Sequence, residues 1–68
     1  MNQPKANISN LINALATCML ADRHALRRKL RDAAEMQKTA DVQANAKAQR
    51  LLNEVAQKMR ASQAKYAA

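Results

Sequence analysis

The 68-residue chain has no glycine, no phenylalanine and no tryptophan, and it contains a single proline. Because the tight turns between β-strands usually need glycine, this absence argues against sheets and hairpins. The sole proline, Pro4, precedes every segment with helical periodicity. Alanine, leucine, lysine, arginine and glutamine, all strong helix formers, dominate the sequence instead. The composition therefore predicts an all-α fold.

The residues from which catalytic and metal sites are built are also scarce. Without glycine the chain has neither a phosphate-binding loop nor a dinucleotide-binding motif. One histidine and one cysteine cannot supply a His–His metal pair, a cysteine zinc cluster or an internal disulfide. No two of the five carboxylates are placed as a persuasive acid–base pair. We expect a segment with no enzymatic activity, no cofactor and no metal.

The lone cysteine and the lone histidine each admit two interpretations. Cys18 lies beside an apolar stripe, where it is either a reactive thiol or a small buried hydrophobic residue, and we favour burial. His24 lies among Asp22, Arg23 and Arg27, where it could contact phosphate or respond to pH. We favour a solvated helix residue with no special role.

Long apolar runs are missing as well. No run of about 18 apolar residues is present, so we expect no transmembrane helix. The first residues carry no basic region, and the apolar residues of 8–20 are interrupted by polar ones, unlike a secretory signal. We therefore predict a cytoplasmic protein.

Three segments have apolar residues at helical spacing and predict helices at about 8–19, 22–36 and 40–67. The expected buried stripes are Ile8, Leu11, Ile12, Leu15 and Met19 in the first segment, Leu26, Leu30 and Ala33 with Met36 or Gln37 at the edge in the second, and Ala44, Ala48, Leu51, Leu52, Val55, Met59, Ser62 and Tyr66 in the third. The sequence thus predicts a small three-helix arrangement with two short helices and one long C-terminal helix.

Short polar side chains mark the expected helix starts, because they accept hydrogen bonds from the free N–H groups of a first turn. Asn7 or Ser9 can cap the first helix, Asp22 the second, and Thr39 or Asp41 the third. We expect a flexible tail at 1–6 and a helical accessory domain at 7–68. No glycine or proline ends the third helix, and we interpret the chain as a fragment of a longer protein.

The charge is strongly unbalanced, with 12 basic and 5 acidic residues and a formal net charge of +7. Such a charge favours attraction to nucleic acid, an anionic membrane or an acidic protein. Five of the basic residues fall within nine positions that contain no acid, and we call them the cationic strip: Arg23, Arg27, Arg28, Lys29 and Arg31. We predict that the cationic strip binds RNA.

The spacing of the cationic strip supports this prediction. Arg23, Arg27 and Arg31 are spaced i, i+4, i+8 and form a row along one helix. Such a row can follow a phosphate backbone, where neutralised phosphates release counterions and guanidinium groups bind two oxygens each. The alternative is a solvated helix face that only keeps the protein soluble. The scarcity of compensating acids favours binding, although Arg28–Asp32 and Arg31–Glu35 have the spacing of intrahelical ion pairs.

Base-specific recognition fits the sequence poorly. Single-strand readers stack bases on aromatic side chains, and the only aromatic, Tyr66, falls on an apolar stripe. We expect contacts to the RNA backbone, steep salt dependence, and a basic surface that Lys47, Arg50 and Lys58 can extend. An amphipathic membrane-surface helix fits less well, because bulky aromatics and a wide apolar face are missing.

Residues Met19–Arg23 (MLADR), followed by Arg28–Leu30 (RKL), resemble the extreme N-terminus of the HrpA-type bacterial ATP-dependent RNA helicases of the DEAH-box class. Those proteins carry a similar Met-Leu-x-Asp-Arg and then Arg-Arg-Leu at the same distance. Lys29 replaces an arginine, and Leu26 stands where an aromatic is usual. Residues Leu51–Lys58 (LLNEVAQK) resemble the helix that follows in that family.

The resemblance implies an auxiliary domain that lies ahead of a helicase core and contributes RNA-backbone binding. The family's ATPase motifs would follow Ala68, and their residues have no counterparts here. The alternative is a protein-docking module, whose apolar stripes pack on the helicase core or a partner without contact to nucleic acid. The short chain, which should bury only about 60% of its unfolded surface, favours that alternative.

Overall fold

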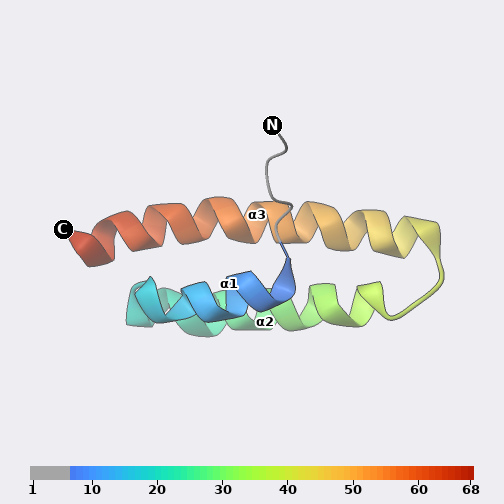
Figure 1. Ribbon diagram of the computed structural model, residues 1–68, viewed down its shortest axis with the longest axis horizontal. Helices are drawn as coiled ribbons and strands as arrows, with labels where there is room; N and C mark the ends of the chain where they lie inside the picture. Colours follow the sequence, from blue (N-terminus) through green and yellow to red (C-terminus); the bar gives the residue numbers. More distant parts are fainter. Residues whose placement is uncertain (1–6) are drawn as a thin grey trace.

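The computed structural model describes residues 7–68, and the tail predicted at 1–6 lies outside the described residues. Helix α1 spans Ile8–Ala14 and continues as a short 3₁₀ turn, Leu15–Thr17; α2 spans Leu20–Gln37 and α3 spans Val42–Ala67. The described residues contain helices and no strands, which confirms the predicted all-α fold with three helices. In Figure 1, α2 and α3 run antiparallel side by side, and α1 lies along α2.

The core forms where α2, α3 and the α1 segment meet. Its fully buried large side chains are Leu30 from α2, Leu52, Val55 and Met59 from α3, and Cys18 from the turn before α2. Burying each leucine contributes about 1.5–3 kcal/mol, so a few such residues dominate the stability of a domain this small. The predicted burial of Cys18 is confirmed, since its side chain is 0% exposed.

The chain leaves helical geometry earlier than the sequence predicts, because the first helix was expected to reach residue 19. The Thr17 hydroxyl donates a hydrogen bond to the Ala14 carbonyl (2.7 Å), and Cys18 is extended with ψ of 162°. This turn lets the chain reverse direction into α2. The other two helices begin and end within two residues of their predicted limits.

Two of the three helix starts use the expected caps. The Asn7 side chain accepts a hydrogen bond from the Asn10 N–H (2.9 Å), and the Asp41 carboxylate accepts one from the Gln43 N–H (2.9 Å). The prediction for Asp22 is wrong, because the residue at the cap position of α2 is Met19 and Asp22 lies in the first turn.

Asp22 instead accepts a hydrogen bond from Ser62, a buried polar residue of α3 that is 3% exposed. The Ser62 hydroxyl oxygen accepts a hydrogen bond from the Met19 N–H (2.8 Å), and the hydroxyl donates to Oδ2 of Asp22 (2.7 Å). In a capping box, the acidic residue in the first turn accepts directly from the N–H of the cap residue. Here the α3 hydroxyl relays that bond, so the start of α2 depends on α3.

Three residues of the predicted apolar stripes are exposed in the fold: Ile12 (49%), Met19 (36%) and Tyr66 (53%). Ile12 lies on the short α1, which covers only part of α2. Met19 follows the turn at Cys18 and therefore leaves the stripe of the first helix. Tyr66 lies in the last turn of α3, which projects past the start of α2 (Figure 1), so the Arg23 guanidinium over its ring leaves it half exposed.

Candidate nucleic-acid interface

The cationic strip divides into three environments, although all five of its residues lie on α2. Arg23 forms hydrogen bonds with the backbone of its own chain. Its Nε donates a hydrogen bond to the Cys18 carbonyl (3.0 Å), and a terminal guanidinium nitrogen donates to the Ala16 carbonyl (3.0 Å). The guanidinium carbon lies 5.7 Å from the centre of the Tyr66 ring, a cation–π distance. Arg23 therefore satisfies carbonyls at the end of the first helical segment.

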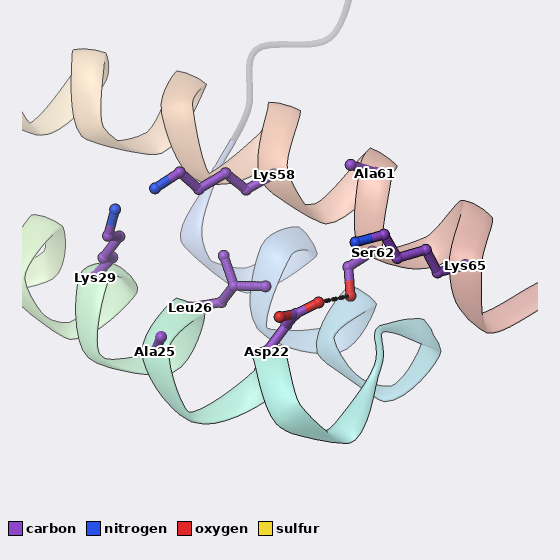
Figure 2. A pocket seen from close by; sticks show the side chains of 8 residues that line it. All are labelled: Asp22, Ala25, Leu26, Lys29, Lys58, Ala61, Ser62 and Lys65. Atoms are coloured by element: carbon purple, nitrogen blue, oxygen red, sulfur yellow. Dashed lines mark hydrogen bonds between the residues drawn. The ribbon is translucent and has the colours of Figure 1, made fainter.

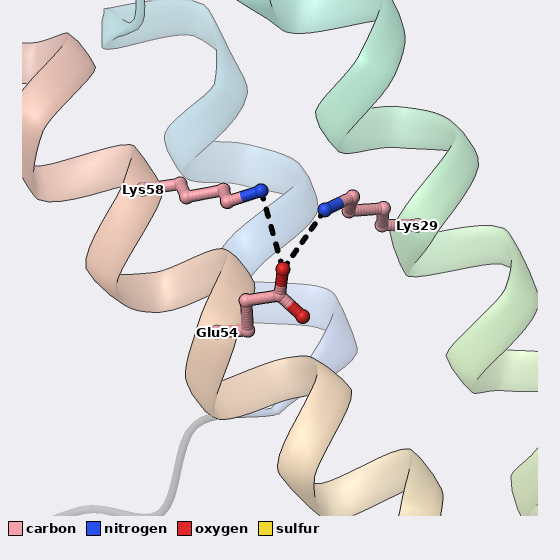
Figure 3. A network of polar contacts seen from close by, with 3 residues as sticks. All are labelled: Lys29, Glu54 and Lys58. Carbon is pink, nitrogen blue, oxygen red and sulfur yellow. Dashed lines mark hydrogen bonds and ion pairs between the residues drawn. The ribbon is translucent and has the colours of Figure 1, made fainter.

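Lys29 also has an internal partner. Its ammonium group donates a hydrogen bond to Oε1 of Glu54 on α3 (3.0 Å), and Lys58 lies 3.2 Å from the same oxygen. Figure 3 shows the two lysines approaching the shared carboxylate from different helices. The hydrogen bonds from Lys29 and then Lys58 hold the pKa of Glu54 below its ordinary value. Lys29 thus links α2 to α3.

The remaining three residues, Arg27, Arg28 and Arg31, are exposed. Across residues 7–68, none of the three takes part in an ion pair. The two intrahelical pairs predicted from spacing, Arg28–Asp32 and Arg31–Glu35, do not form; Glu35 lies 3.5 Å from Lys38 instead. The guanidinium groups of these three residues, which we call the arginine face, are available to an external anion.

A basic pocket between α2 and α3 brings together residues that are far apart in sequence. Lys29, Lys58 and Lys65 line it, with Leu26 and Asp22 below them (Figure 2), and its volume is about 300 Å³. Lys58 was considered as an extension of the basic surface, but its partnership with Lys29 has no local signal in the sequence. The carboxylates of Asp22 and Glu54 offset much of the lysine charge, which makes this pocket a weaker anion site than the arginine face.

A second depression, the α1–α2 groove, borders the arginine face. Ile8 and Ile12 from α1 and Leu30 and Ala34 from α2 form its apolar lining, Arg27 and Arg31 complete it, and its volume is about 320 Å³. Periodicity alone assigned Ile8 and Ile12 to the core and gave no indication of this groove. It places aliphatic surface beside two arginines that have no ion-pair partner among residues 7–68.

The described residues offer little for other kinds of site. Within residues 7–68, no three His, Cys, Asp or Glu side chains gather as a metal site. His24 is exposed, as expected. No helix of the described part is both long and apolar enough to cross a membrane.

Comparison of the chain with protein-family models, with curated proteins and with solved structures finds no match. The resemblance to helicase N-termini is therefore a prediction from the residues alone.

Proposed function

We propose that this chain is a basic helical accessory module that binds the RNA backbone, and that it is the N-terminal auxiliary domain of an HrpA-type ATP-dependent RNA helicase. The observation that carries the proposal is the arginine face: Arg27, Arg28 and Arg31 are exposed on one helix and form no ion pair within the described residues. The module itself contributes no catalysis, and the ATPase belongs to the core. The proposal includes the cytoplasmic location expected from the sequence.

The geometry of α2 supports backbone contact over base reading. Arg27 and Arg31 are one turn apart, about 6 Å along the axis, so two neighbouring guanidinium groups can bind successive phosphates. The only aromatic, Tyr66, stacks with Arg23 at the far end of α3. Binding should therefore depend weakly on base identity and strongly on salt, because phosphate neutralisation releases counterions.

The test replaces the arginine face with glutamine in the triple variant Arg27→Gln/Arg28→Gln/Arg31→Gln. The matched control is Lys38→Gln/Arg60→Gln/Lys65→Gln, which removes the same number of charges from exposed positions outside the predicted RNA-binding surface. Fluorescence anisotropy with a labelled oligouridylate measures affinity at several salt concentrations, and circular dichroism confirms that both variants fold.

The arginine variant should bind more weakly, and its slope of log K against log salt should fall by about 2, since each single-strand phosphate contact contributes about 0.7. The control should keep most of both quantities. Equal losses in the two variants would show that only the net charge attracts RNA, and the arginine face would then have no special role.

A further inference from the structure

The α1–α2 groove has an apolar lining that the RNA proposal leaves unused. Its most accessible aliphatic side chain, Ile12, is 49% exposed. Leu30 closes the bottom of the groove, since it is 1% exposed. A bound phosphate chain would contact the guanidinium groups of Arg27 and Arg31 and leave the aliphatic surface in water. Burying that surface is favourable in proportion to its apolar area, so a ligand with apolar groups gains more.

The chemistry of the groove favours a peptide over a nucleobase. Single-strand readers stack bases mainly on aromatic side chains, and the apolar walls of the groove are aliphatic, with no aromatic residue. Aliphatic side chains pack well against isoleucine and leucine, and carboxylates form bidentate pairs with arginine. Arg27 and Arg31, which lack ion-pair partners within residues 7–68, are the complement of an acidic segment.

A second copy of this chain is a poor occupant. Each copy carries a net charge of +7 and only five acidic residues, so two copies repel one another. The lysine pocket between α2 and α3 is also a poorer site for an acidic peptide, because Asp22 lines it and Glu54 bonds two of its lysines. The charges therefore favour the α1–α2 groove for an acidic partner.

We propose that the α1–α2 groove binds an acidic amphipathic segment of another protein. An aliphatic side chain of that segment enters between Ile12 and Ala34, and flanking carboxylates pair with Arg27 and Arg31. Helix-in-groove recognition of this kind uses anchors one turn apart. The docking does not depend on RNA binding, but the two ligands share two arginines and would exclude one another.

The probe is a labelled synthetic helical peptide with leucines at i, i+3 and i+7 on one face and glutamates beside them. A control peptide keeps every glutamate and replaces the leucines with serine. Anisotropy titrations against the full chain should give at least about tenfold weaker binding for the serine peptide, because each buried leucine contributes at least that factor. Equal affinities would overturn the proposal, since charge alone would then explain binding.

Protein variants locate the site. Ile12→Ser should weaken the leucine peptide about tenfold and leave oligouridylate binding unchanged. Leu20→Ser is the matched control, since Leu20 is 75% exposed and does not line the groove. Equal losses of peptide affinity in the two variants would overturn the proposal. If Ile12→Ser weakened oligouridylate binding as much as peptide binding, the proposal would also be overturned, because the groove would then bind a nucleobase.

A measurement on the unaltered chain covers the case in which Ile12→Ser does not fold. The leucine peptide should shift the methyl resonances of Ile8, Ile12 and Leu30 and leave those of Val42, the first residue of α3, unchanged. Shifts confined to other residues would overturn the proposal. If the chain binds the peptide but not RNA, the proposed function is rejected and this inference stands. If the chain binds both ligands, excess oligouridylate should displace the peptide.

Discussion

Replacing Ser62 with alanine should destabilise the whole domain, although the change removes a single oxygen. The Ser62 hydroxyl bonds both the Met19 N–H (2.8 Å) and the Asp22 carboxylate (2.7 Å), and it is the one point where α3 holds the first turn of α2 by hydrogen bonds in the described chain. Ser62 is 3% exposed, so water cannot simply replace its oxygen without entering the interface between α2 and α3.

The expected loss follows from these bonds. A neutral hydrogen bond contributes about 0.5–1.5 kcal/mol, and one to a carboxylate about 1.5–3 kcal/mol. Alanine recovers about 0.5 kcal/mol as the better helix former. Asp22 is half-buried, so water restores part of its lost bond, and the net destabilisation of Ser62→Ala should be about 1.5–3 kcal/mol. A domain of 68 residues has about 3–10 kcal/mol in total, so the loss is a large fraction.

Thermal melts followed by circular dichroism measure this loss, and we expect a fall in Tm of roughly 6–24 °C. Gln57→Ala, at an exposed position of α3, is the control and should change Tm little. A double-mutant cycle with Asp22→Ala should give a coupling energy of about 1 kcal/mol or more. If Ser62→Ala melts within about 2 °C of the unaltered chain, the hydrogen-bond relay does not hold the start of α2.

Two further predictions concern the core and the ion pairs of Glu54. Leu52 is 0% exposed, and Leu52→Ala should lower the free energy of unfolding by about 2–5 kcal/mol, measured by urea titration. Leu20 is 75% exposed, so the control Leu20→Ala should lower it by less than about 0.5 kcal/mol. Similar losses in the two variants would contradict the assigned core. The lysines lower the pKa of Glu54 on folding, so its ion pairs stabilise the fold above the ordinary carboxyl pKa of about 4.5, and that stabilisation is lost as the pH falls through the lowered value. The Tm difference between the unaltered chain and Glu54→Gln should therefore be present at neutral pH and vanish in strong acid; a difference that persists there would exclude the ion pairs as its cause.

The fold class could be predicted from the sequence because helix formation depends on neighbours within about four residues. The absence of glycine argued against hairpins, and apolar spacing identified Leu30, Leu52, Val55 and Met59 as core residues, all of which are buried. The caps Asn7 and Asp41 were among the predicted choices for the same reason, since each bonds an N–H two or three residues away.

The candidate site was less predictable, because contacts between helices decide which of its basic side chains are bonded within the fold and which stay exposed. The sequence presents Arg23, Arg27 and Arg31 as one row, and a local pattern cannot show that Arg23 bonds the carbonyls of Ala16 and Cys18. That bonding requires the turn that ends the first helical segment. Three of the five residues in the cationic strip remain exposed and without ion-pair partners within residues 7–68.

By itself, the sequence determined that this chain is helical and basic, because composition and short-range spacing decide those properties. Only the tertiary structure decided which charges are satisfied. Lys29 meets Glu54 across 25 residues and Asp22 meets Ser62 across 40, distances that helix periodicity does not span. The tertiary structure also decided that the Ile12 side chain of α1 stays exposed beside Arg27 and Arg31, since a helix of seven residues is too short to cover α2.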